Sequence, residues 1–246
     1  MTYIAKTEKL PIPGLFNARE LGGMPAKDGR TIRTHRLIRS DALDHLSEED
    51  IELLSSYPVQ AVIDLRSESE AARNPDKILS DPRFTYYNYS LLPISADYQK
   101  NSLIQDTIQT SLGMLYVWMA ENAKEAFAQV FRAILKEAPK TVLFHCAHGK
   151  DRTGMITALL YLLCGVSRED IVSNYAISYE YVKDLVAPLI AKNPPEVAHI
   201  FRSDEENIRM FLSHLDDKYE GKAEVYMESI GLAKEEITSL RNLLLD

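Results

Sequence analysis

The chain has 246 residues, of which 46% are hydrophobic and 26% are charged, and its formal net charge is −8. This length and composition are typical of a globular protein with a sizeable core, in one large domain or two small ones. The acidic balance argues against general binding to nucleic acid or to an anionic membrane surface, so an anionic ligand needs a local positive site. The start, MTYIAKTEKL, lacks the apolar core of a signal peptide, and no apolar run reaches transmembrane length. We therefore expect a cytoplasmic protein without an integral membrane segment, with export by another route left open.

The two cysteines are expected to be free thiols. If a helix begins near Arg152, Cys164 lies about 18 Å along it. A disulfide needs Cα atoms only about 4.4–6.8 Å apart, so a bridge to Cys146 is excluded in that geometry. Free thiols fit a reducing compartment.

Short strand-like runs alternate with helical patterns in the first half of the chain. Strands are predicted at 36–39, 59–64, 84–89 and 141–145, and helices from Ser47 and over 121–136. Ser47-Glu-Glu-Asp50 resembles a capping box. The pattern is weak between about 91 and 119, which predicts an insertion or a lid there.

After Arg152 the pattern is helical almost to the C-terminus. Further N-cap signatures begin at Ser167 and Ser203, and Gly231 precedes a last helix over 235–245. Strands that alternate with helices predict an α/β fold, with a central, mostly parallel sheet flanked by helices and a helical C-terminal elaboration. We expect one domain over 1–246. A separate helical domain after about residue 167 is the alternative.

The stretch HCAHGKDRTG, residues 145–154, lies between a predicted strand and an apolar helical run. In this arrangement the backbone N–H groups of the loop and the helix dipole attract an anion. Gly149 permits the turn, and the Arg152 guanidinium can hold two phosphate oxygens. The same environment favours the thiolate of Cys146, to which Thr153 can donate a hydrogen bond. A thiolate that faces a bound phosphorus predicts phosphoryl transfer to Cys146, followed by hydrolysis.

At these residues the chain resembles the protein tyrosine phosphatase superfamily, because His145-Cys-Ala-His-Gly-Lys-Asp-Arg152 fits its Cys-x5-Arg signature. The Gly-Lys-Asp-Arg ending is similar to the bacterial tyrosine phosphatase family 3 group of atypical tyrosine, dual-specificity and phosphoinositide phosphatases. Asn17-Ala-Arg-Glu-Leu-Gly-Gly23, Val62-Ile-Asp-Leu-Arg66 and Tyr226-Met-Glu-Ser-Ile-Gly231 are also similar to segments of that group. The resemblance implies the cysteine-phosphatase fold and a phosphocysteine intermediate.

The resemblance also implies roles for single residues. Cys146 is the expected nucleophile and Arg152 the clamp on the phosphoryl group, with no metal and no organic cofactor. Lys150 is similar to the loop lysine that meets additional phosphates in relatives acting on inositol lipids. The residues expected to bind substrate, or to edge the site, are Ala147, His148, Gly149, Lys150, Thr153, Asp64 and Arg66. Arg66 and Arg19 fit a structural ion pair equally well, and for Asp64 pairing with Arg66 is the favoured reading.

The general acid is less directly indicated. The Trp-Pro-Asp loop of many relatives is missing, because the single tryptophan, Trp118, is followed by Met119. The resemblance therefore suggests Asp151, inside the loop, as the proton donor. Asp97 is the alternative, since it falls where a separate acid loop would lie.

The leading hypothesis is a cysteine-dependent phosphatase for phosphotyrosine, with phosphoserine, phosphothreonine and phosphoinositides as further substrates. A phosphatase mainly for phosphoinositides or small phosphate esters is the alternative within the same chemistry. A phosphate-binding module without catalysis and a rhodanese-like sulfurtransferase are more remote. A zinc site is disfavoured because His145, Cys146 and His148 lack paired Cys-x2-Cys spacing.

Overall fold

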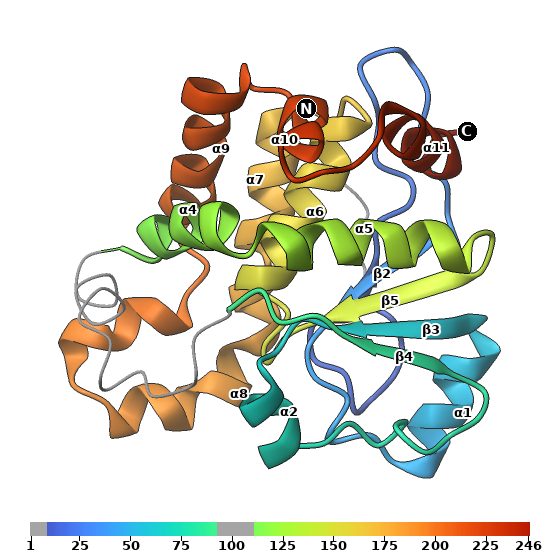
Figure 1. Cartoon of the computed structure of the whole chain (residues 1–246). Helices are drawn as coiled ribbons and strands as arrows, with labels where there is room; N and C mark the ends of the chain where they lie inside the picture. The colour runs from blue at the N-terminus through green and yellow to red at the C-terminus, as the bar shows by residue number, and fades with distance from the viewer. Residues whose placement is uncertain (1–8, 93–110) are drawn as a thin grey trace.

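The computed structural model describes residues 9–92 and 111–246. A five-stranded sheet lies at its centre with the strand order β1-β2-β5-β3-β4 (Figure 1). Strands β2, β5, β3 and β4 run parallel, and only β1 pairs antiparallel, with β2. This confirms the predicted mostly parallel α/β sheet. The strands are β1 (Arg19–Glu20), β2 (Leu37–Ser40), β3 (Val59–Asp64), β4 (Thr85–Asn88) and β5 (Thr141–His145).

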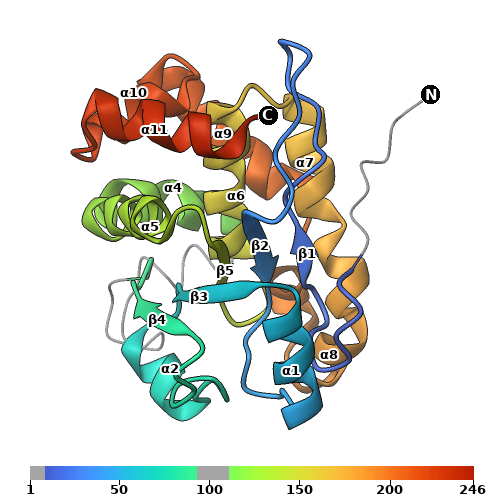
Figure 2. The same ribbon diagram turned by 90° about the vertical axis from the view of Figure 1, so that its right-hand side faces the viewer.

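Helices surround the sheet and make up most of the C-terminal half. Figure 2 shows α1 on one side of the sheet and α5, α6, α10 and α11 on the other. The helices before β5 are α1 (Glu48–Ser56), α2 (Glu68–Arg73), α4 (Leu112–Asn122) and α5 (Lys124–Glu137). Those after β5 are α6 (Asp151–Leu163), α7 (Arg168–Ala176), α8 (Ser178–Lys192), the 3-10 helix η1 (Pro195–Phe201), α9 (Glu205–Tyr219), α10 (Ala223–Ser229) and α11 (Lys234–Leu244).

The central strands are buried on both faces, as expected for parallel strands covered by helices. Side chains of a strand alternate between the two faces, and β5 divides its residues accordingly. Phe144 belongs to the larger core cluster, whereas Leu143 belongs to the smaller one on the α1 side. The end of β5 is therefore packed on both faces of the sheet. This packing holds the first residue of the following loop in place.

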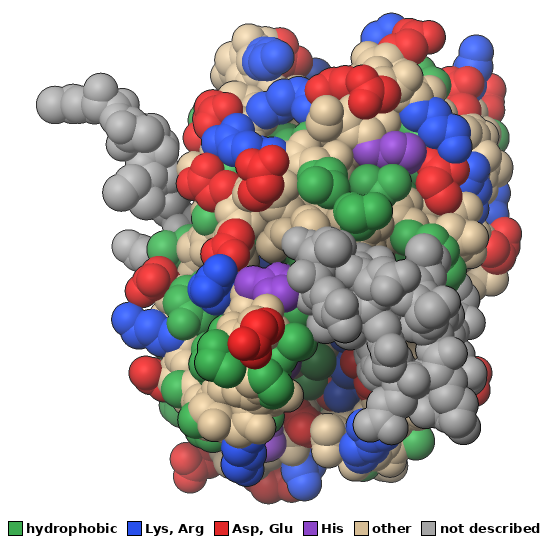
Figure 3. Space-filling view, turned by 90° about the vertical axis from the view of Figure 1, so that its left-hand side faces the viewer, with side chains coloured by type: hydrophobic (Ala, Val, Ile, Leu, Met, Phe, Trp, Pro, Cys, Tyr) green, Lys and Arg blue, Asp and Glu red, His purple; other side chains and the backbone are tan. Residues whose placement is uncertain are grey.

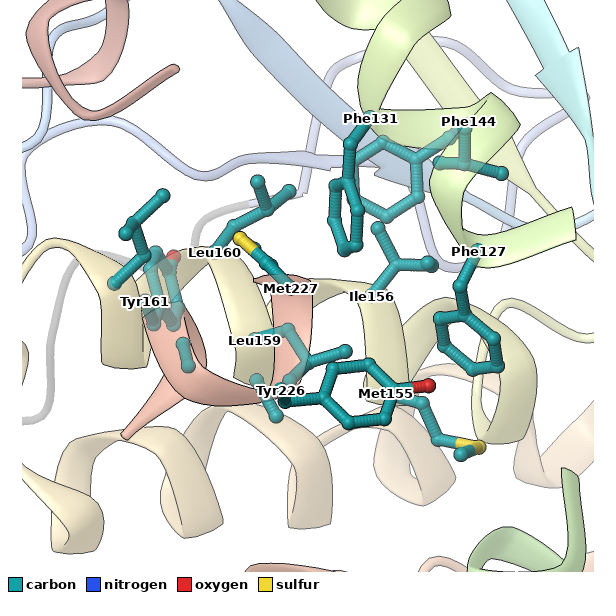
Figure 4. Close-up of a cluster of buried hydrophobic side chains, with 14 of the residues drawn as sticks. Phe127, Phe131, Phe144, Met155, Ile156, Leu159, Leu160, Tyr161, Tyr226 and Met227 are labelled. Atoms are coloured by element: carbon teal, nitrogen blue, oxygen red, sulfur yellow. The ribbon is translucent and has the colours of Figure 1, made fainter. Parts of the chain in front are cut away.

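Helix α6 is buried around nearly its whole circumference. Ile156 of α6 lies beside Phe144 of β5 and the two phenylalanines of α5, Phe127 and Phe131 (Figure 4). Each of these side chains is fully buried, and burial of such a group stabilises the fold by about 1.5–3 kcal/mol. This packing holds the first turn of α6 against the carboxyl end of β5.

The local structure departs from the sequence-based expectations at two helices. The predicted helix over 121–136 is split, because α4 ends at Asn122 and α5 begins at Lys124. Ser47 and Ser167 cap their helices as predicted, but Ser203 does not, since Asp204 takes the N-cap position of α9 without a side-chain bond. Local sequence patterns leave helix boundaries uncertain by a residue or two.

Helices α7, α9, α10 and α11, all after residue 167, share the larger core cluster with the sheet. Ile208 and Phe211 of α9 and Leu240 of α11 belong to the same buried cluster as Phe144. Both cysteines are free, as expected. No helix among the described residues is both long enough and apolar enough to cross a bilayer.

Candidate active site

The loop 146–150 connects the end of β5 to the start of α6, as the sequence predicts. Gly149 has a φ of +65°, and a Cβ atom there would lie 2.5 Å from the carbonyl oxygen of Ser40. Only glycine fits this position, because it adopts a positive φ readily and has no Cβ atom to clash with Ser40. At Gly154 a Cβ atom would lie 2.8 Å from the ring of Tyr175, so this second glycine lets Tyr175 pack against the first turn of α6.

The carbonyl groups of the loop are held on its buried side, which we call the back of the loop. The Asn17 amide donates to the carbonyls of His148 (2.9 Å) and Gly149 (3.0 Å). The Arg39 guanidinium donates to the carbonyls of Gly149 (2.7 Å) and Lys150 (3.3 Å). Because C=O and N–H point in opposite directions across a trans peptide, tying the carbonyls back turns the following N–H groups to the other side. We call that side the front.

Asn17 and Arg39 are themselves fixed by buried partners. The backbone N–H of Asn17 donates to Asp41 (2.8 Å), and Arg39 donates to the side chain of Asn174 (2.7 Å). Arg19 donates to the backbone carbonyl of Asn17 (2.9 Å) and to that of Asn174 (2.8 Å), so it is a structural residue rather than one at the edge of the site. Of this group the sequence pointed to Asn17 only through the similarity of its segment, and it gave no role to Arg39.

A second buried cluster lies beneath His145 at the end of β5. Arg66 bridges Asp64 (2.8 Å) and Asp76 (2.9 Å), and His145 Nε2 lies 3.1 Å from Asp76. Burial alone would lower the pKa of His145, but the charges of Asp76 and Asp64 outweigh it and raise that pKa to about 9. The cluster thus consists of two carboxylates balanced by a guanidinium and an imidazolium.

Three groups of this cluster, Asp64, Asp76 and His145, are close enough together to suggest a metal site. The Arg66 guanidinium bonds both carboxylates, however, so a cation already balances their charge. The pair between Asp64 and Arg66 is the favoured interpretation of Asp64 from the sequence, and a substrate contact of either residue stays a prediction. Asp64 is fully buried behind the loop, and Arg66 lines a neighbouring hollow while its charge is taken up by the two aspartates.

On the front side, the predicted clamp Arg152 is held by a carboxylate that the sequence did not single out. Its two terminal nitrogens lie 2.7 and 2.9 Å from the two oxygens of Glu70, in a bidentate pair. Burial would raise the pKa of Glu70, but Arg152 outweighs it and lowers that pKa to about 2. Glu70 also accepts from the N–H of Ser67 (2.9 Å) in the capping box of α2, so the start of α2 positions Arg152.

Cys146 lies at the base of the loop and is 1% exposed. The Thr153 hydroxyl is fully buried and has no hydrogen-bond partner among the described residues. Cys146 precedes α6 and Thr153 is in its first turn, as predicted. The predicted hydrogen bond from the Thr153 hydroxyl to the Cys146 sulfur is not formed. An unsatisfied buried hydroxyl costs about 1–3 kcal/mol, which favours a state in which an acceptor reaches it.

Asp151 stands at the rim of the site with its side chain 25% exposed. The hydroxyl of Tyr116 on α4 donates a short hydrogen bond to it, and Tyr116 is bonded in turn to the hydroxyl of Tyr175 at 2.7 Å. Burial and the charge of Asp151 raise the pKa of Tyr116 well above its ordinary value, so Tyr116 stays a donor. The sequence gave no signal for this pair of tyrosines, which come from α4 and α7. The alternative acid, Asp97, lies outside the described residues.

Lys150 is oriented differently from the expectation. Its side chain is buried, and its ammonium donates to the backbone carbonyls of Ile200 (3.2 Å) and Arg202 (3.0 Å). His148 is half-buried in front of the loop. Burial and the charge of Lys150 lower the pKa of His148 to about 4, so this histidine is neutral at neutral pH.

Among the described residues, two hollows in front of the loop share Glu70, Ala147 and His148. The first, which we call the apolar hollow, has a volume of about 320 Å³. Its apolar walls are Leu92, Leu112, Leu115, Met119, Ile200 and Phe201, and its polar groups include Tyr116, Asp151 and Arg152. The second, the polar hollow, has a volume of about 430 Å³ and is lined by Asp41, Ala42, Asp44, His45, Arg66, Arg73, Asn74, Leu185, Pro188 and Leu189 in addition to the shared residues.

The face drawn in Figure 3 carries no broad basic field among the described residues. There the lysine and arginine side chains of the described residues are interspersed with aspartate and glutamate. Attraction of an anion to this protein is therefore local, through the loop and Arg152. The predicted lid over about 91–119 mostly concerns residues 93–110, outside the described part, and Leu112–Asn122 is helix α4. The lid stays a prediction.

Comparison with known proteins places relatives over almost the whole chain. Residues 10–246 match the model of the tyrosine phosphatase family. A tyrosine-protein phosphatase of Nostoc commune is 33% identical over 231 residues, covering 88% of this chain and 76% of that protein. A putative tyrosine-protein phosphatase of Cupriavidus necator is 33% identical over 173 residues, covering 65% and 59%. The triple specificity protein phosphatase PtpB of Mycobacterium tuberculosis is 28% identical over 204 residues, covering 72% and 71%.

Proposed function

Because the chain belongs to the tyrosine phosphatase family, we propose that it hydrolyses phosphotyrosine through a phosphocysteine intermediate on Cys146. One observation carries the proposal. The loop 146–150 has its carbonyls tied back by Asn17 and Arg39, which leaves N–H groups and the Arg152 guanidinium to receive a dianion in front of Cys146.

In the first step the Cys146 sulfur attacks the phosphorus of the bound ester. The S–P bond forms as the bond from phosphorus to the tyrosyl oxygen breaks, and the proton of Asp151 goes to that oxygen. In the second step water attacks the phosphorus, the S–P bond breaks, and Asp151 takes a proton from the water. Backbone N–H groups and Arg152 stabilise the charge on the phosphoryl oxygens in both steps.

The assignment of Asp151 as the acid is part of the proposal. Its support is its place on the rim of the apolar hollow, where the oxygen that leaves the phosphorus would lie. The hydroxyl of Tyr116 holds one carboxyl oxygen, and the other lies 3.7 Å from the Lys150 ammonium, so both neighbours orient the carboxyl group.

The pair between Arg152 and Glu70 is the resting arrangement of the clamp. A phosphate dianion and the Glu70 carboxylate offer the same kind of bidentate acceptor to a guanidinium. Substrate binding therefore exchanges part of this pair for contacts with the phosphoryl oxygens, while Glu70 keeps the guanidinium oriented.

Further parts of the prediction remain proposals. A cytoplasmic location is supported by the two free thiols, Cys146 and Cys164. The organisation as one domain over 1–246 is supported by the core cluster that β5 shares with α9 and α11. Phosphoserine, phosphothreonine and phosphoinositides are proposed as further substrates to be compared with phosphotyrosine.

The test is hydrolysis of para-nitrophenyl phosphate and of a phosphotyrosine peptide. We expect turnover that persists with a chelator, is blocked by vanadate, and is abolished in Cys146→Ser. Cys164→Ser is the matched control, because that thiol lies at the C-cap of α6, at the opposite end of the helix from the loop, and its loss should leave turnover unchanged. Turnover in Cys146→Ser, or none in the wild type, would exclude the proposed function.

A further inference from the structure

Lys150 connects the loop to a separate segment of the chain. An ammonium group has three N–H donors, and two of those of Lys150 are used by the carbonyls of Ile200 and Arg202. On the remaining side lies the Asp151 carboxylate, at 3.7 Å. The group is buried and its bonds are made within the protein, so it is not presented to a ligand in front of the loop.

The segment that Lys150 holds is the end of the 3-10 helix η1. None of the residues of η1 is fully buried, and a 3-10 helix has weaker internal hydrogen bonds than an α-helix. The anchoring of such a segment depends on the contacts it makes with its neighbours. Ile200 and Phe201, at the end of η1, form one wall of the apolar hollow.

The chemistry of the apolar hollow favours a flat apolar group. Six apolar side chains line it, and among its described lining residues Arg152 is the only cationic one, since His148 is neutral. Arg152 is needed for the phosphoryl group that reacts. Additional phosphates or hydroxyls of a sugar-like ring would face Glu70, Asp151 and apolar carbon, whereas an aromatic ring would bury apolar surface there.

We propose that Lys150 is a positioning residue that holds Ile200 and Phe201 against the loop, and that the apolar hollow is thereby selective for aryl phosphates over phosphorylated polyols such as phosphoinositides. This inference rests on the proposed function, since it concerns the leaving group of the same reaction. It replaces the predicted contact of Lys150 with additional substrate phosphates.

The experiment compares kcat/KM for a phosphotyrosine peptide with that for a soluble short-chain phosphoinositide. We expect the wild type to prefer the peptide by about a hundredfold, the scale of discrimination that a shaped apolar pocket provides. Lys150→Met keeps the apolar stem and removes the ammonium. It should lower kcat/KM for the peptide about tenfold, mainly through KM, and change that for the phosphoinositide by less than about twofold.

Phe201→Ala provides a second route, because it removes the wall without altering the loop. It should reduce the preference for the peptide in the same direction as Lys150→Met. Leu189→Ala, in the polar hollow, is the matched control and should leave the preference unchanged. Amide hydrogen exchange over 195–202 should become faster in Lys150→Met and not in Leu189→Ala.

The outcomes separate this inference from the proposed function. A larger loss for the phosphoinositide than for the peptide in Lys150→Met would mean that the ammonium meets substrate phosphate, and equal losses would mean general damage to the loop. Either result overturns the inference, as does an unchanged preference in Phe201→Ala or a wild type that prefers the phosphoinositide. In each of these cases para-nitrophenyl phosphate is still hydrolysed through Cys146, so the proposed function stands.

Discussion

The back and the front of the loop 146–150 differ in how their charges are satisfied. Behind the loop, Arg39 and His145 are fully buried, and each lies among several fixed partners that come from different elements. In front, Arg152 and Asp151 are 11% and 25% exposed. Arg152 pairs with Glu70, and Asp151 accepts from Tyr116 and lies 3.7 Å from the Lys150 ammonium. We infer from this difference in burial that an exchange of partners costs more at the back than at the front. The molecule therefore separates the groups that shape the loop from those that meet a substrate.

The largest effect is expected when the back of the loop is broken. Arg39→Met removes the donor to the Asn174 side-chain oxygen and one of the two donors to the Gly149 carbonyl, which keeps only Asn17. Loss of a buried charged donor of this kind costs about 3 kcal/mol. We expect the free energy of unfolding of Arg39→Met, measured by urea titration, to fall by this amount. Its kcat/KM should fall at least a hundredfold.

The matched control for Arg39→Met is Arg209→Met, which removes surface pairs with Glu169 and Glu205 and should cost below about 1 kcal/mol. If the unfolding free energy of Arg39→Met fell no further than that of the control, the back would not be the rigid support that the contacts indicate.

The next largest effect is a dependence of the protein's stability on pH, caused by the buried His145 at the back of the loop. The pKa of His145 is raised from 6.5 to about 9 in the fold, so the folded state holds a proton that the unfolded state loses. This stabilisation is fully present below pH 6.5 and is lost as the pH rises through 9, in total about 3 kcal/mol. Urea unfolding of the wild type at pH 6.5 and at pH 9.5 measures it.

Asp76→Asn sharpens this measurement, because Asp76 is the carboxylate that does most to raise the pKa of His145. The variant should be less stable at pH 6.5, and its stability should change less between the two pH values. An equal slope in wild type and variant would show that His145 does not carry the proton.

A smaller effect is expected from the pair in front. Glu70→Gln keeps a hydrogen-bond acceptor for Arg152 but removes the charge that fixes its guanidinium. We expect about a tenfold loss in kcat/KM, equal to about 1.4 kcal/mol of transition-state stabilisation. The free energy of unfolding should fall by less than in Arg39→Met, because the pair is partly exposed. A variant as unstable as Arg39→Met would remove the distinction between the two sides.

The smallest effect concerns the pair of tyrosines beside Asp151. Tyr116→Phe removes the hydroxyl that orients the carboxyl, so turnover should slow about fivefold for substrates with poor leaving groups and little for activated aryl phosphates. Tyr175→Phe keeps the bond from Tyr116 to Asp151 and should have the weaker effect. Equal losses for all leaving groups would contradict a role in proton donation.

The sequence predicted best what is contiguous in the chain. The strand, the loop and the helix at 141–163 were expected as they are found, because a buried apolar run, a glycine and a second apolar run follow one another. The capping box at Ser47 and the alternation of strands and helices could be predicted for the same reason, because they depend on residues close together in the sequence. Because β5 is the central strand of the sheet, a correct prediction of the strand, loop and helix at 141–163 also located the site at the carboxyl end of that strand.

The partners of the loop could not be predicted from spacing. Glu70 and Tyr116 reach the site from elements about 35 to 82 residues away in the chain. Lys150 is in the expected neighbourhood, but the direction of a side chain at the start of a helix depends on tertiary contacts. Lys150 turned toward the carbonyls of η1 because a buried charge requires such partners. The pairing of Asp64 with Arg66, two residues apart in the chain, was by contrast the favoured interpretation of the sequence and is found.

The most direct test of the account is to trap the intermediate on the nucleophile. The wild type is mixed rapidly with a phosphotyrosine peptide, quenched, digested and examined by mass spectrometry without added metal. The account predicts one phosphoryl group on Cys146, formed before product accumulates and not formed in Cys146→Ser. Turnover of the peptide with no phosphoryl group on Cys146 at any time would contradict it.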